Sequence, residues 1–118
     1  MRAKDKLGQW GEDLAARHLT QAGLVVLERN WRCPIGEIDI VARDGDELVV
    51  CEVKTRSGLE FGSPLEAVTP AKTQRLGRLA LAWMEARDVR AKKIRIDVIG
   101  VVRRPPHEPR VEHLRGVG

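Results

Sequence analysis

The sequence predicts a single-domain mixed α/β fold, in which helices flank a sheet. Two segments carry apolar residues at helical spacing, and two others alternate apolar and polar residues on either side of a glycine turn. The chain has 118 residues and is 42% hydrophobic, which is enough for one core and too little for two. The expected order is helix, strand, strand, strand, helix, strand, with a right-handed crossover through the second helix.

The first helix is expected over residues 5–22, where small and apolar side chains recur every three or four positions, and Gly23 is placed to end it. Glycine within a helix costs on the order of 1 kcal/mol relative to alanine, so Gly8 and Gly11 indicate close approach of the backbone to a neighbouring element. Glu12 lies on the same stripe and should face inward. The alternative is a charge at the edge of the core that reaches out to water.

Three strands are expected after this helix. Residues 24–27 form a short apolar strand, and residues 28–36 are expected to be irregular. Residues 37–43 and 47–55 then form a hairpin, because Asp44-Gly45-Asp46 is a turn signal between them. Residues 56–63 contain two glycines and are expected to form a mobile loop.

The second helix is expected to begin at Thr69-Pro70, with the threonine hydroxyl as cap and proline in the first helical position, and to run to about Arg87. Its apolar stripe consists of Leu76, Leu79, Ala80 and Trp83. Residues 94–102 form the last strand. Three prolines make residues 105–118 a tail that should be poor in regular structure, beyond a domain of residues 1–104.

Charged residues interrupt the strands of the hairpin. Side chains alternate along a strand, so Glu52 and Lys54 share one face, whereas Val49, Cys51 and Val53 share the other. Asp39 stands between Ile38 and Ile40 and should point to the face that both isoleucines avoid. An even number of turn residues brings Asp39 onto the face of Glu52, and an odd number separates them.

Two neighbouring carboxylates repel one another, and a hard divalent cation such as Mg²⁺ would compensate the repulsion. Lys54, on the same face, is suited to orient or help deprotonate an attacking water and to stabilise charge on a phosphate. Lys72 falls on the inward stripe of the second helix and should point toward the sheet. The alternative for Lys54 is an ion pair with Glu52 or Asp39 on a hydrated sheet face, and for Lys72 an outward-reaching edge charge.

Charge is unevenly distributed along the chain, whose net charge is +4. Residues 1–69 hold 9 basic and 12 acidic residues, hence −3, whereas residues 70–118 hold 12 basic and 5 acidic residues, hence +7. The second half could therefore hold phosphates, with Arg75 and Arg78 as candidate contacts, or simply form a hydrated surface.

No apolar run predicts a signal peptide or membrane span, and Cys33 and Cys51 are expected to be free thiols, so a cytoplasmic location is expected. The three histidines are too scattered in sequence to propose a metal cluster.

The chain combines the short motifs Gly8-Gln9-Trp10-Gly11-Glu12, Gly36-Glu37-Ile38-Asp39, Glu52-Val53-Lys54, Phe61-Gly62, Lys72 and Arg95-Ile96-Asp97-Val98. Together they resemble the YraN family of small bacterial proteins, which is similar to archaeal Holliday junction resolvases of the PD-(D/E)XK nuclease superfamily. The resemblance covers most of residues 5–102. The one departure from the superfamily motif is Ile38, which stands where the superfamily name has proline.

The resemblance implies a restriction-endonuclease-like core and a site that binds Mg²⁺ or Mn²⁺. Asp39, Glu52 and the Val53 carbonyl would ligate the metal, and Lys54 would serve the attacking water. Glu12 would complete the site, and Lys72 would be an accessory lysine. The implied substrate is DNA, with branched DNA as one candidate, and the implied assembly is a homodimer.

Three functions compete on the sequence alone: a metal-dependent endonuclease, a nucleic-acid-binding module that does not cut, and a protein-interaction adaptor. The complete set Glu12, Asp39, Glu52 and Lys54 favours the first. A module that only binds has no need to hold carboxylates against a phosphate backbone. Trp10, Trp31 and Trp83 are expected to be packing residues and not platforms for base stacking.

Overall fold

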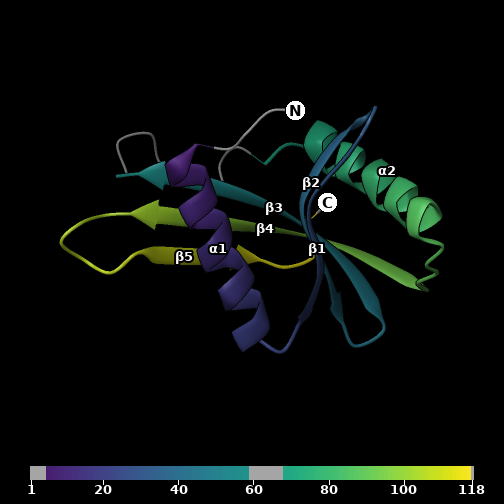
Figure 1. Ribbon diagram of the computed structural model, residues 1–118, viewed down its shortest axis with the longest axis horizontal. Helices are drawn as coiled ribbons and strands as arrows, with labels where there is room; N and C mark the ends of the chain where they lie inside the picture. The colour runs from purple at the N-terminus through teal and green to yellow at the C-terminus, as the bar shows by residue number, and fades with distance from the viewer. Residues whose placement is uncertain (1–4, 59–67, 118) are drawn as a thin grey trace.

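The computed structural model describes residues 5–58 and 68–117 and confirms the predicted mixed α/β fold. The first six elements follow the predicted order, and a seventh, β5, is added at the C-terminal end (Figure 1). The elements are α1 (Lys6–Gln21), β1 (Val25–Cys33), β2 (Gly36–Asp44), β3 (Glu47–Ser57), α2 (Pro70–Arg87), β4 (Lys93–Arg103) and β5 (Arg110–Leu114).

The strands form one sheet in the order β1-β2-β3-β4-β5. Strand β3 pairs with β4 in parallel, as the crossover through α2 requires, and the other three pairings are antiparallel. The two helices cover opposite faces, because alternate residues of β3 pack against different helices. Val49 and Cys51 belong to the core beneath α1, and Leu48 and Val50 to the core beneath α2.

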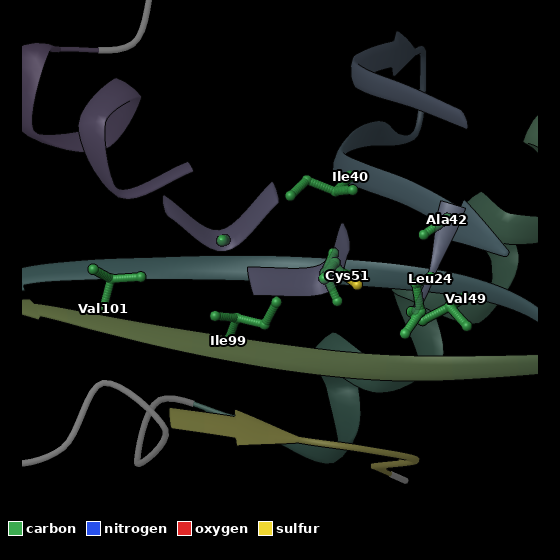
Figure 2. Packing of buried hydrophobic residues seen from close by; sticks show 9 residues of the cluster. Leu24, Ile40, Ala42, Val49, Cys51, Ile99 and Val101 are labelled. Atoms are coloured by element: carbon green, nitrogen blue, oxygen red, sulfur yellow. The ribbon is translucent and has the colours of Figure 1, made fainter. Parts of the chain in front are cut away.

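Each face of the sheet has its own apolar core. The core beneath α1 joins Ala15 and Leu19 of the helix to residues of the strands and the α1–β1 connection (Figure 2). The core beneath α2 is built on the predicted stripe of Leu76, Leu79, Ala80 and Trp83. Trp31 and Trp83 are buried in this second core, and Trp10 packs at the edge of the first, so all three tryptophans pack as predicted.

Helix α1 begins and ends as its sequence predicts. The Asp5 side chain caps the first turn by accepting a hydrogen bond from the Gly8 N–H at 2.6 Å. Gly23 follows the C-cap residue with φ +94°, a backbone angle that favours glycine. Gly11 is buried because Thr55 of β3 lies against it, which confirms the predicted close approach for this glycine.

Helix α2 also follows its sequence signals. Thr69 Oγ1 accepts a hydrogen bond from the Lys72 N–H at 3.2 Å, and Pro70 occupies the first helical position. The helix ends at Arg87, the predicted boundary.

Strand β1 is longer than predicted, since residues 28–33 continue the strand instead of forming an irregular stretch. The polar run Glu28-Arg29-Asn30 obscured the strand pattern, but its charged members have partners from the helices. Glu28 accepts hydrogen bonds from Trp83 Nε1 and from Arg87 of α2 at 2.7–2.9 Å. A register shift between Val26 and Glu28 further breaks the simple alternation.

The predicted tail is not poor in structure, because residues 110–114 form β5 against β4. The expectation failed because the exposed edge of β4 offers backbone groups that a following segment can pair with. Side chains reinforce the pairing. Asp97 of β4 is fully buried and accepts hydrogen bonds from His113 of β5 at 2.8 Å and from the Gly116 N–H at 3.0 Å.

Other sequence-based expectations have mixed outcomes. Strand β3 runs through Ser57, so the loop expected over residues 56–63 does not include its first two residues, and residues 59–63, with Phe61-Gly62, lie outside the described part. Cys33 and Cys51 are free thiols, as predicted. Among the residues described, no helix is long and apolar enough to cross a membrane.

Candidate functional site

The candidate site lies where β2 and β3 separate. The ladder between them ends at the pair Ile40–Cys51, while β3 continues beside β4 to Ser57. The end of the β1–β2 hairpin turns away toward α2 (Figure 1). Ile38 accordingly packs with Trp31 in the core beneath α2, whereas Ile40 packs beneath α1. The prediction that Ile38 and Ile40 face the same core was therefore wrong, because the strand changes direction at Asp39.

This separation leaves a cleft of about 320 Å³ between the sheet and the first half of α2. Four of the predicted site positions line it together: Asp39 from β2, and Glu52, Val53 and Lys54 from β3. Two more, Lys72 and Arg75, line it from α2. Its remaining lining residues are Gly36, Glu37, Leu76 and Leu79.

The length of the hairpin turn accounts for this convergence. Asp44 pairs with Glu47, so the turn consists of two residues, Gly45 and Asp46. An even turn was the condition under which Asp39 would share a face with Glu52. The ladder pairs Ile40 with Cys51, so the same register extended by one position would set Asp39 opposite Glu52, and both residues line the cleft. The predicted grouping of the two carboxylates is confirmed.

The backbone of β3 orients the Asp39 carboxylate. Its Oδ2 accepts a hydrogen bond from the Val53 N–H at 2.8 Å. In an antiparallel pair this N–H would ordinarily bind a carbonyl of the neighbouring strand, but β2 has left the ladder at this point. The aspartate side chain thus takes the place of a backbone acceptor and is held in the lining of the cleft.

The two lysines and Glu52 form a compact charged group. Lys72 Nζ lies 3.9 Å from Glu52 Oε2, and both side chains are mostly covered. A side-chain hydrogen bond with Lys54 lowers the pKa of Lys72, and burial lowers it further, while Glu52 acts in the opposite direction. Lys72 points toward the sheet as predicted, and its ammonium group faces the cleft instead of open solvent.

Glu12 faces inward as predicted but does not line the cleft. Its side chain is fully buried, and its Oε1 accepts hydrogen bonds from Arg29 Nε at 2.7 Å and from Asn30 Nδ2 at 2.9 Å. Asn30, whose φ is +55°, falls opposite Asp39 in the register between β1 and β2. Glu12 is therefore connected to the site through Asn30, at the point where β2 changes direction.

The two candidate phosphate contacts on α2 are placed differently. Arg75 lines the cleft beside Lys72. Arg78 is also exposed, but it lines a separate, more apolar groove with Leu81 and Ile94. The structure thus brings only one of the two arginines to the carboxylates.

The donor atoms at the cleft fit a hard divalent cation. Asp39 and Glu52 supply carboxylate oxygens, which suit Mg²⁺ or Mn²⁺. Within residues 5–58 and 68–117, no group of three or more histidine, cysteine, aspartate or glutamate side chains is arranged to hold a metal. Two carboxylates beside a backbone carbonyl leave several coordination positions to water or substrate, as is usual for Mg²⁺ in phosphate-processing sites.

Comparison with known sequences establishes the family. Residues 11–101 match the profile described as "Uncharacterised protein family UPF0102". The chain belongs to family UPF0102. A UPF0102 protein of a Nocardioides species is 58% identical over 98% of this chain and 93% of its own length, and one of Beutenbergia cavernae is 58% identical over the full length of both. The sequence resemblance to YraN proteins is thereby confirmed.

Two solved structures have a similar arrangement to this UPF0102 chain at low sequence identity. The Holliday junction resolvase Hjc of Archaeoglobus fulgidus matches with a TM-score of 0.43 and 16% identity, covering 89% of this chain and 75% of Hjc. A complex of EndoMS with double-stranded DNA matches with a TM-score of 0.44 and 18% identity, covering 90% of this chain and 43% of that one.

The UPF0102 structure also shows residues that the sequence analysis missed. Glu37 lines the cleft and pairs with Arg32 at 2.9 Å. Arg56 extends the face of Glu52 and Lys54, since β3 runs through Ser57 and does not give way to the predicted loop at residue 56. The alternation along β3 carries the signal for this position. His18 and His113 lie 95 residues apart in sequence, yet their ring nitrogens are 3.1 Å apart. Sequence spacing carried no signal for that pair.

Proposed function

We propose that this protein is a metal-dependent endonuclease that hydrolyses phosphodiester bonds in DNA. The observation that supports this most directly is the convergence of Asp39, Glu52 and Lys54 on one cleft where two strands separate. An acid pair with an adjacent lysine, open to solvent and bordered by further cations, matches the needs of phosphodiester hydrolysis.

Asp39, Glu52 and the Val53 carbonyl are the proposed metal ligands. The N–H and C=O of a residue in an antiparallel strand point to the same side, so the Val53 carbonyl is directed toward the strand that carries Asp39. A divalent cation bound there would neutralise charge on the phosphate and lower the pKa of a coordinated water. The hydrogen bond from the Val53 N–H keeps Asp39 oriented before any metal binds.

Lys54 and Lys72 have different roles in this proposal. Lys54, next to Glu52 on the same face, orients the attacking water and stabilises negative charge on the phosphate. Lys72 lies across the cleft and limits the repulsion between the carboxylates through its contact with Glu52. Glu12 holds Asn30 opposite Asp39, so it acts as a positioning residue from behind the cleft.

Nucleic acid would approach along the open side of the cleft, where Arg75 lies. Arg75 is the proposed contact to a neighbouring phosphate, and Arg78 a more distant one on the same helix. Branched DNA as substrate and a homodimer that presents two clefts extend the resemblance to junction resolvases. Light scattering with and without a four-way junction measures both the assembly and its dependence on DNA.

The decisive experiment is a nicking assay on linear, flapped and four-way DNA in Mg²⁺ or Mn²⁺, run in parallel with a gel-shift assay. Glu52→Ala removes a metal ligand and Lys54→Ala removes the group that serves the water, so both should abolish hydrolysis while binding survives. Arg90→Gln, an exposed change beyond the far end of α2, is the matched control.

The results separate the competing functions. Binding without cutting by the wild-type protein on every substrate would favour the non-cleaving module. Metal-independent cutting that persists in Glu52→Ala would show that the chemistry comes from another source. Equal loss of binding and cutting in Lys54→Ala would contradict the proposal that Lys54 serves hydrolysis while other residues provide the binding.

A further inference from the structure

Arg56 continues the line of charged side chains that begins at Glu52. Thr55 faces α1, where it lies against Gly11. Because side chains alternate along a strand, Arg56 lies on the opposite face, the one that also carries Lys54 and Glu52. Its partner in the parallel ladder is Val102 of β4, a buried apolar residue.

The guanidinium of Arg56 carries a buried hydrogen-bond donor. Its Nε is buried, and no acceptor for it is found among the residues that the structure describes. Two other partly buried arginines have carboxylate partners: Arg29 binds Glu12 and Asp13, and Arg95 binds Asp97 and Asp44. A buried donor without an acceptor is destabilising, and natural proteins retain few of them.

We propose that Arg56 binds a backbone phosphate of the nucleic acid strand held in the cleft, an inference that rests on the proposed nuclease function. Arg56 as a whole is only partly buried, so its guanidinium can turn toward a strand seated beside Lys54. A phosphate oxygen then supplies the acceptor that the Nε–H lacks among the described residues, and the planar guanidinium suits bidentate phosphate binding. Arg56 touches the substrate away from the reacting bond, so it is a substrate-binding residue and takes no part in the proton transfers.

Strand geometry sets which phosphate Arg56 can reach. Residues two apart on one face of a strand are separated by roughly 7 Å. Arg56 therefore lies about this far beyond Lys54, on the side away from Glu52. The phosphate it binds is a neighbour of the one under attack, and Arg56 fixes the direction in which the strand runs through the cleft.

The test is Arg56→Met. Methionine keeps an unbranched side chain but removes the charge and the hydrogen-bond donors of the guanidinium. Fluorescence anisotropy with a labelled DNA duplex measures affinity across a salt series, and circular dichroism measures Tm without DNA. The affinity should fall by about tenfold or more, and the log–log salt slope should decrease by roughly 0.9. Tm should stay unchanged or rise, because a buried, unsatisfied donor has been removed.

Arg90→Gln serves as the control for the general removal of one positive charge, and its affinity should change far less. Unchanged affinity in Arg56→Met would overturn the proposal, as would a lower Tm with unchanged affinity, which would assign Arg56 to the stability of the free protein. Binding without hydrolysis by the wild-type protein would refute the nuclease function alone, since the Arg56 comparison depends only on binding. Failure of the wild-type protein to bind DNA would refute both.

Discussion

The Asp39 carboxylate accepts a hydrogen bond from the Val53 N–H at 2.8 Å, just beyond the last ladder pair of β2 and β3. This contact ties a side chain of one strand to the backbone of the other where ordinary pairing has ended. It fixes one proposed metal ligand relative to the strand that carries the second. The orientation of Asp39 is therefore set by the contacts of the protein itself.

Metal binding should depend on the charge of Asp39 more than on its hydrogen bond. Asp39→Asn keeps an oxygen acceptor for the Val53 N–H but removes the negative charge that attracts the cation. We expect calorimetric titration with Mn²⁺ to lose its signal in Asp39→Asn and in Asp39→Ala. Glu85→Gln, an exposed change on α2, should leave the titration as in the wild-type protein. A wild-type binding curve in Asp39→Asn would place the metal elsewhere.

Arg75 should contribute more to DNA affinity than Arg78, because only Arg75 lines the cleft. Replacing Arg75 by alanine should weaken binding to all sequences alike and reduce the log–log salt slope by roughly 0.9, because the protein then neutralises one duplex phosphate fewer. Arg78→Ala is the matched change, three residues along the same helix and also exposed. Gel-shift titrations at several salt concentrations measure both slopes. A larger effect of Arg78→Ala than of Arg75→Ala would mean that the DNA passes on the other side of α2.

Gly11→Ala should destabilise the fold where α1 packs on β3. A Cβ at this position would come within 2.7 Å of Thr55 Cγ2 and 2.8 Å of Thr55 Cβ, and it would lie closer still to Oγ1. Overpacking of this kind typically costs about 1–3 kcal/mol of unfolding free energy. Urea denaturation should show the decrease, and Thr55→Gly in the Gly11→Ala background should recover part of it.

Gly77→Ala is the control for that prediction, because it makes the same change inside the other helix. Among the described residues, its Cβ would meet only Ile96 Cδ1 at 3.9 Å, an ordinary contact. Alanine is the better helix former, so the unfolding free energy should rise by up to about 1 kcal/mol. Equal effects of the two substitutions would mean that helix propensity, and not close packing, explains Gly11.

Stability should fall as the pH is lowered below about 6.5, the ordinary pKa of a histidine. Burial lowers the pKa of His18, and electrostatic interactions with His113 and Arg115 lower it further. The unfolded chain therefore binds a proton at a higher pH than the folded protein does, and the unfolding free energy decreases as the pH falls through this window. In His18→Gln the decrease between about pH 6.5 and 5 should be smaller in urea denaturation.

Asp97 should contribute a separate decrease of stability at lower pH. Burial raises the pKa of Asp97, but hydrogen bonds from Arg95, the Gly116 N–H and His113 outweigh it and hold the pKa below its ordinary range. The stability this provides is present above the unfolded pKa near 3.8 and is lost as the pH falls through the folded value.

The His18 prediction is tested above this range. If the unfolding free energy of His18→Gln changed with pH in parallel with that of the wild-type protein throughout the range above about pH 5, the role given to His18 would be contradicted.

Local patterns in the sequence determined most of the elements and half of the site. Capping at Thr69-Pro70, the apolar stripe of α2 and the Gly45 turn are short-range signals, and the structure confirms each of them. Strand alternation placed Glu52 and Lys54 on one face without any knowledge of the fold. Such features depend on residues a few positions apart, whose relative geometry the backbone fixes.

Only the tertiary structure decided what lies beyond the regular ladder. The change of direction at Asp39, which sends Ile38 to the other core and opens the cleft, depends on how β1, β2 and α2 pack together. The partners of Glu12, the separate positions of Arg75 and Arg78, and the pairing of β5 with β4 are likewise set by residues distant in sequence. Periodicity describes which face of an element a side chain occupies, whereas the neighbour on that face is set by the packing of whole elements, which no local pattern encodes.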